Sequence, residues 1–121
     1  MNNQLTDFSF HNKNNQGEDI ANSVSPGKKP RSSMAPFLVF KEEDLIGVVG
    51  SPGGSRIICY VSRILYEVLY LKIDPEQAIV KPHLCSRNKY SEVEKGFKSS
   101  KMKKKLEKIN HRIKVKEMTS G

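Results

Sequence analysis

Large apolar side chains are concentrated in one part of this 121-residue chain, between residues 34 and 80. Residues 1–33 hold few of them, and residues 95–117 are crowded with lysine. The hydrophobic fraction of the whole chain, 36%, is lower than the roughly 45–50% of an average soluble domain, a range that also counts glycine. Because burial of apolar surface is the main driving force of folding, a core can form only around the middle segment.

The middle segment has the signals of a β-hairpin followed by a helix. Two apolar runs, Phe37–Phe40 and Leu45–Val49, flank a short polar turn, which is typical of an antiparallel hairpin. The runs are continuous rather than alternating, so we expect this sheet to be covered on both faces in a layered architecture. After a glycine-rich break, we expect a largely buried helix from Ser55 to Lys72, because apolar residues recur there at helical spacing. They are Ile58, Val61, Leu65, Val68 and Leu69.

The second half of the chain predicts shorter elements. Asp74 can cap a short helix that has Pro75 at its first position, and Gln77 completes a capping box. This helix is expected to end by Pro82. Hydrophobic periodicity then predicts three further elements: a strand at 91–94, a lysine-rich helix at 98–109 and a half-buried strand at 111–117.

The first part of the chain is different in character. Residues 9–31 are rich in polar residues, glycine and proline, and they show no helical or strand period. Since this stretch is longer than an ordinary connection, it is either disordered or a functional lid. We therefore expect an irregular segment at 1–31, a partial αβ domain at 32–117 and a tail at 118–121. The fold class expected for the domain is α+β.

The formal net charge of +8 comes mainly from lysines between residues 95 and 116. An excess of this kind can indicate binding to nucleic acid or to an anionic membrane surface. Here the lysines fall on a predicted helix without interleaved aromatic residues, so we interpret them as a solvated face and predict no specific nucleic-acid partner. No run reaches the roughly 18 apolar residues of a membrane span. The first residues lack the features of a signal peptide, so the chain as it stands is expected in the cytoplasm.

Neither the cysteines nor the histidines have the spacing of metal ligands. Cys59 lies in an apolar run, so we expect it to be a small buried side chain. A disulfide between Cys59 and Cys85 is neither supported nor excluded by the sequence. The histidines at positions 11, 83 and 111 are scattered, and we predict no metal and no cofactor.

The glycine-rich break between the second strand and the helix is the most informative local feature. Glycine at 53 and 54 allows the backbone to approach a ligand closely. At a helix start, the first amides have no partner within the helix, and the helix dipole adds partial positive charge there. Such a site suits phosphate, a carboxylate or the oxyanion of a tetrahedral intermediate. The Gly53 and Gly54 segment is therefore either a plain tight turn or an anion site, and it lacks the Lys-Ser/Thr of a phosphate loop.

Three sequence blocks follow one another at a characteristic separation. They are Asn-Asn-Gln-Leu-Thr-Asp-Phe-Ser at 2–9, Arg-Ser-Ser-Met-Ala-Pro at 31–36 and Gly-Ser-Pro-Gly-Gly-Ser-Arg-Ile-Ile at 50–58. On their own, Ser32 and Ser33 would be ordinary loop residues. Together the blocks resemble the γ-glutamyltransferase family, also called glutathione hydrolases, and the resemblance spans nearly the whole chain.

The resemblance implies a fold, a reaction and a set of site residues. Family members are N-terminal-nucleophile hydrolases of αββα architecture, and the N-terminal threonine of their small subunit attacks the γ-glutamyl amide of glutathione. By the resemblance, Gln4 and Asp7 bind the α-amino group of the γ-glutamyl moiety. Ser32 and Ser33 contact its α-carboxylate, and the Gly53–Gly54 amides form the oxyanion hole.

The chain also departs from the family pattern. The nucleophilic threonine of the family precedes the first block, and Thr6, which is internal, does not replace it. The segment 9–31 is shorter than the lid loop of bacterial relatives and has no tyrosine, and the residues at 82–86 replace the family's Pro-Arg-x-His-His. We therefore expect a piece of a small subunit that is inactive alone, with glutathione or γ-glutamyl compounds as ligands and a large-subunit polypeptide as partner. The alternatives are one half of a split enzyme and a non-catalytic γ-glutamyl- or anion-binding module.

Overall fold

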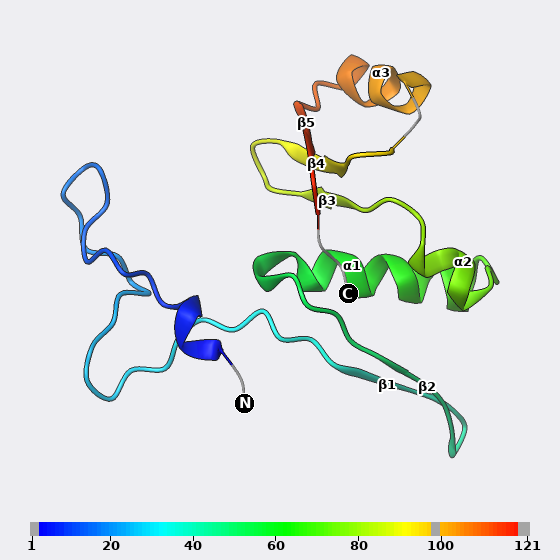
Figure 1. Ribbon diagram of the computed structural model, residues 1–121, viewed down its shortest axis with the longest axis horizontal. Coiled ribbons are helices and arrows are strands. Elements are labelled where there is room, and N and C mark those ends of the chain that lie inside the picture. Colours follow the sequence, from blue (N-terminus) through cyan, green and yellow to red (C-terminus); the bar gives the residue numbers. More distant parts are fainter. Residues whose placement is uncertain (1–2, 98–99, 119–121) are drawn as a thin grey trace. The chain divides into compact units, whose positions relative to one another are not determined.

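The computed structural model of the chain describes residues 3–97 and 100–118 (Figure 1). The chain divides into two compact units, Met1–Ser33 and Met34–Gly121. Helices and short sheets are both present, as expected for the α+β class. In chain order the elements are η1 (Gln4–Asp7), β1 (Phe37–Lys41), β2 (Asp44–Val49), η2 (Gly54–Arg56), α1 (Ile57–Leu65), η3 (Tyr66–Tyr70), α2 (Pro75–Ile79), β3 (Leu84–Ser86), β4 (Ser91–Glu94), α3 (Ser100–Lys108) and β5 (Ile113–Lys116).

The first unit is irregular except for one turn of 3₁₀ helix, η1, which the sequence did not predict. Two isolated bridges shape the rest, a parallel one between Ser9 and Ser23 and an antiparallel one between Lys13 and Asp19. Phe8 is buried in this unit, with 8% of its surface exposed. The absence of regular helices and strands from residues 9–31 agrees with the missing period in the sequence.

The predicted hairpin is confirmed. Strands β1 and β2 pair antiparallel from Phe37 opposite Val49 to Lys41 opposite Asp44, with a register shift between Val39 and Phe40. The expectation that both faces are covered is wrong for the described part of this chain. Apolar side chains of the hairpin are largely exposed, for example Leu38 at 62% and Val48 at 68%.

The predicted helix is confirmed as a continuous run from η2 through α1 to the π-helical turn η3. It ends near Lys72, whose φ of 57° is left-handed and stops the helix. Its burial was overestimated, because within it only Tyr60 and Val61 are fully buried. Tyr66 is more than half exposed.

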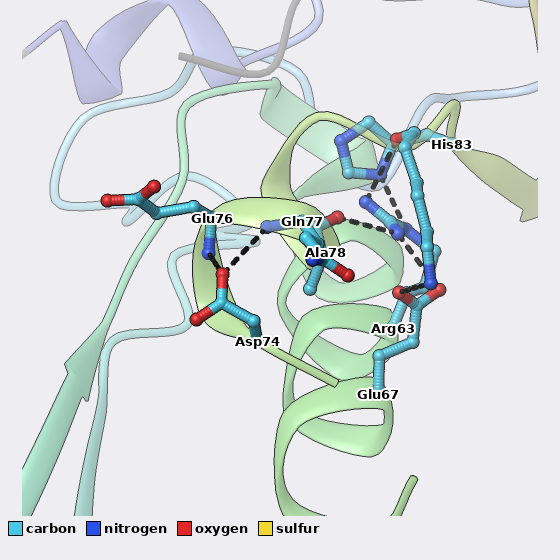
Figure 2. Close-up of polar contacts among 8 residues, drawn as sticks. Arg63, Glu67, Asp74, Glu76, Gln77, Ala78 and His83 are labelled. Carbon is cyan, nitrogen blue, oxygen red and sulfur yellow. Dashed lines mark hydrogen bonds and ion pairs between the residues drawn. The ribbon is translucent and has the colours of Figure 1, made fainter. Parts of the chain in front are cut away.

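The short helix α2 has the predicted cap. The Asp74 side chain accepts hydrogen bonds from the backbone N–H groups of Glu76 and Gln77, at 3.0 and 3.2 Å (Figure 2). Arg63 of α1 holds this helix, since its guanidinium donates to the carbonyl oxygen of Ala78 at 3.0 Å (Figure 2). The guanidinium also donates to Glu67 of η3 at 3.0 Å.

A second, three-stranded sheet has the order β3-β4-β5, with β3–β4 antiparallel and β4–β5 parallel. Strands β4 and β5 were predicted, and the three-residue strand β3 was not. A Cys59–Cys85 disulfide joins α1 to β3. The sequence had left this disulfide open, and Cys59, expected to be buried, is half-buried. Among the described residues, no helix has the length and apolarity to span a membrane.

Candidate functional site

The glycine turn lies where the sequence predicted it, between the end of β2 and the helix start (Figure 1). Gly53 has φ 134° and Gly54 has φ 55°, both in the range that favours glycine. The carbonyl oxygen of Gly53 accepts the first helical bond from the Arg56 N–H at 3.1 Å. Within the described part of the chain, neither the Gly53 nor the Gly54 N–H has a hydrogen-bond acceptor. The turn thus presents two adjacent unpaired donors at a helix start.

A buried aromatic ring supports this turn. A Cβ atom at Gly53 would lie 2.6 Å from Cε2 of Tyr60, so only glycine fits there. Tyr60 is 1% exposed, and its ring centroid lies 4.1 Å from that of His83, with the two rings tilted by 37°. His83 is itself 2% exposed. Burial, followed by the charge of Arg63, lowers the pKa of His83. The imidazole is accordingly neutral, and its Nδ1 accepts from Nε of Arg63 at 3.1 Å.

The residues just after the turn are tied to the three-stranded sheet. Nε of Arg56 donates to Oε2 of Glu92 at 2.6 Å, and Nζ of Lys116 lies 3.0 Å from the other Glu92 oxygen. The hydrogen bond from Arg56 is the main reason why the pKa of Glu92 falls to about 2. Arg87 donates to the carbonyl oxygen and to the hydroxyl oxygen of Ser55, at 3.1 and 2.8 Å. This network could not be predicted from the sequence, because its members are far apart in the chain.

The other predicted site residues belong to the first unit. Gln4 and Asp7 are half-buried at the two ends of η1, and Ser32 and Ser33 close the unit. Because the glycine turn belongs to the second unit, a single site that joins all six residues stays a prediction.

Within the first unit, one unpredicted side chain connects the two predicted binding segments. Nδ2 of Asn22 donates to the carbonyl oxygen of Asp7 at 2.6 Å, and its Oδ1 accepts from the N–H of Arg31 at 2.9 Å. Asn22 therefore holds η1 beside the residue that precedes Ser32. A signal for this role was absent from the sequence, since Asn22 lies in an aperiodic stretch.

A cavity of about 320 Å³ lies between β2 and α1 in the second unit. Its lining is mostly aliphatic, with Ser51, Tyr60 and His83 as polar members. Gly50 is part of this lining, whereas Gly53 and Gly54 are not. The described residues contain no cluster of three metal-ligating side chains.

Comparison with known proteins gives the family of the chain. All 121 residues match the family model for gamma-glutamyltranspeptidase. "Glutathione hydrolase 2" of Arabidopsis thaliana is 33% identical over 69% of this chain and 15% of its own length. The "putative inactive glutathione hydrolase 4" of the same organism is 33% identical over 69% of this chain and 47% of its own length. A threonine-to-alanine mutant of Helicobacter pylori gamma-glutamyltranspeptidase has a TM-score of 0.81 at 32% identity, over 99% of this chain and 68% of that one.

The chain belongs to the gamma-glutamyltranspeptidase family. The predicted fold, part of the αββα N-terminal-nucleophile hydrolase architecture, is confirmed by the structural match. The chain spans less than half the length of either Arabidopsis relative.

Proposed function

We propose that this chain supplies the γ-glutamyl-binding and oxyanion-stabilising part of a γ-glutamyl transfer site. The threonine nucleophile comes from a polypeptide segment that these 121 residues do not contain. The substrates are glutathione and related γ-glutamyl compounds, and a large-subunit polypeptide completes the site. Family membership supports the reaction class, because the match extends over all residues of the chain.

Each predicted residue has a role that its chemistry allows. The carboxylate of Asp7 and the amide of Gln4 bind the α-ammonium group of the γ-glutamyl moiety. The hydroxyl groups of Ser32 and Ser33 donate to its α-carboxylate. When the nucleophile adds to the γ-carbonyl carbon, the carbonyl oxygen becomes an oxyanion, and the Gly53–Gly54 amides donate to it.

The observation that carries the proposal is the pair of unpaired amides at the glycine turn. Donors that are already oriented stabilise developing charge without reorganisation, and loss of one such donor typically lowers kcat by about 10²–10³-fold. The ring of Tyr60 packs against Gly53, and this contact favours an amide donor with a fixed orientation over a mobile loop.

The proposal can be tested by NMR titration of the ¹⁵N-labelled full chain with glutathione. We expect shifts at the amides of Gly53, Gly54, Ser32 and Ser33, and none with cysteinylglycine, which lacks the γ-glutamyl group. Ser33→Ala should weaken binding. Ser51→Ala is the matched control, because its hydroxyl donates to the carbonyl oxygen of the adjacent Pro52 and Ser51 is not one of the predicted substrate-binding residues. Absence of all four shifts would refute the proposal.

A chromogenic γ-glutamyl amide tests the nucleophile. The chain alone should give no turnover, since covalent catalysis has no first step without the nucleophile. Turnover should appear when a family large subunit that carries the threonine segment is added. Turnover by the chain alone that is lost in Thr6→Ala would show that Thr6 is the nucleophile.

One relative is named as putatively inactive, which favours a second candidate function. In that case the chain binds γ-glutamyl compounds or other anions without catalysis. Glutathione-dependent shifts together with no turnover after addition of the large subunit would support this second function.

A further inference from the structure

We propose that Glu92 is a positioning residue for the glycine turn, acting through Arg56, and that it sets the orientation of the Gly53 and Gly54 amides. The inference rests on the proposed oxyanion role of these amides. Glu92 itself touches no predicted substrate group.

Arg56 links the glycine turn to the three-stranded sheet. Arg56 follows Gly54 by two residues, and its N–H donates to the carbonyl oxygen of Gly53. The same residue's side chain donates to Glu92 in the centre of β4, 36 positions away in sequence. One residue therefore closes the turn with its backbone and fastens the turn to the sheet with its side chain.

The buried charge of Glu92 has an energetic cost. Glu92 is 1% exposed, so its carboxylate loses nearly all of its hydration. Removal of a charge from water costs several kcal/mol, and a buried ion pair is often no more stable than an apolar replacement of the same size. Net stability is therefore a weak reason for a buried glutamate here. The burial of Glu92 is better explained by a fixed negative charge that holds the Arg56 side chain in one orientation.

Three further contacts also restrain the turn or the carboxylate that holds it. Lys116 of β5 binds the second oxygen of Glu92, which prevents the carboxylate from rotating away. Arg87 holds the Ser55 carbonyl from the turn between β3 and β4. Gly53 is packed on Tyr60, so the turn is fixed at Gly53, Ser55 and Arg56 and is open only at its free amides.

The test uses Glu92→Gln in the ¹⁵N-labelled full chain. We expect the order parameters of Gly53 and Gly54 to fall from about 0.85, typical of rigid backbone, to below about 0.6. We also expect the Arg56 amide to exchange at least about tenfold faster. Glu117→Gln is the matched control, because it removes an exposed ion pair with Lys95 near the same sheet, and it should leave these values unchanged.

The double variant Arg56→Gln/Glu92→Gln separates positioning from stability. It removes both charges of the Arg56–Glu92 pair, so Arg56 is not left without its partner as it is in Glu92→Gln. The midpoint of thermal unfolding should therefore recover relative to Glu92→Gln, while Gly53 and Gly54 stay disordered. If the turn regains its order together with the midpoint, the residue is only structural and the inference is wrong. If Glu92→Gln does not fold, the single variant Arg56→Gln tests the inference, since Lys116 still neutralises Glu92 in that variant. An ordered turn in Arg56→Gln would also overturn the inference.

Kinetics of the complex with the large subunit give an independent readout. Glu92→Gln should lower kcat about tenfold at unchanged KM, because an oxyanion exists only after bond formation begins. A rise in KM with unchanged kcat would contradict the positioning role. Failure of the wild-type complex to turn over substrate would refute the proposed function, whereas the order parameters would still decide the inference.

Discussion

At Gly53 two constraints act on the same residue. Its φ of 134° lies where side chains are rarely accommodated, and a Cβ would overlap the ring of Tyr60 at 2.6 Å. Gly54 differs, because its φ of 55° is left-handed but no atom lies within 4 Å of the position that a Cβ would occupy. The two neighbouring glycines therefore separate the effect of steric overlap from that of backbone strain.

We expect Gly53→Ala to lower the free energy of unfolding by about 2–4 kcal/mol, from backbone strain and overpacking together. Gly54→Ala should lose only about 1 kcal/mol, from strain alone. Urea unfolding followed by circular dichroism measures both. Equal losses would show that the Tyr60 contact does not constrain the turn.

Glu92 makes stability depend on pH in a defined window. Its pKa falls from 4.5 to about 2 in the folded chain, chiefly because Arg56 donates to it. The unfolded chain therefore binds more protons between these values. The stabilisation is complete above about pH 4.5 and is lost as the pH falls toward about 2.

Glu92→Gln should remove this part of the pH dependence. We expect the difference in unfolding free energy between wild type and variant to be constant above about pH 5 and to shrink below it, by up to about 1.4 kcal/mol per pH unit. The lowered pKa of His83 also destabilises the fold as the pH falls, but near and below 6.5, and equally in both proteins. A difference that is flat down to pH 3 would contradict the assignment.

At the scale of elements, local signals in the sequence predicted most of the secondary structure. The hairpin, the cap at Asp74 and the alternating strand β5 each depend on residues within a few positions of one another. Strand β3 was missed because it has three residues, which are too few to show a period in the sequence. The glycine turn was predicted from its own residues, whereas its support by Glu92 depends on a contact across 36 positions.

The disulfide between α1 and β3 was left open by the sequence for the same reason, since its cysteines are 26 positions apart. Closure of a loop of this length stabilises by about 2–4 kcal/mol, mainly by restricting the unfolded chain. Cys59→Ser/Cys85→Ser should lose that amount in urea unfolding. Dithiothreitol should destabilise the wild type to the same extent and leave the double variant unchanged. Two free thiols in the denatured, unreduced wild type would disprove the bridge.

At the scale of the whole molecule, the described residues leave much apolar surface uncovered. The hairpin forms a two-stranded sheet by itself, so both outer edges present backbone donors and acceptors. A two-stranded hairpin is marginally stable in water without further packing. Exposed side chains of its strands include Phe37, Leu38, Phe40, Leu45, Ile46 and Val48.

We expect the chain alone to be marginally stable and to associate through this hairpin. Full burial of one large aliphatic side chain contributes about 1.5–3 kcal/mol, whereas a domain is stable by only about 5–15 kcal/mol, so a few uncovered side chains decide the outcome. Sedimentation with circular dichroism should show oligomers and a broad thermal transition. Leu38→Lys/Val48→Lys, which changes two directly paired residues, should shift the chain toward monomer.

Val80→Lys is the matched control, because Val80 is 81% exposed beyond the end of α2 and outside the hairpin. It should leave the sedimentation profile unchanged, since it adds the same kind of charge without changing the surface that associates. Equal loss of association in both variants would attribute the effect to net charge rather than to the hairpin. A wild-type monomer with a sharp transition above about 60 °C, near the upper end of the usual mesophile range, would show that the described core is sufficient by itself.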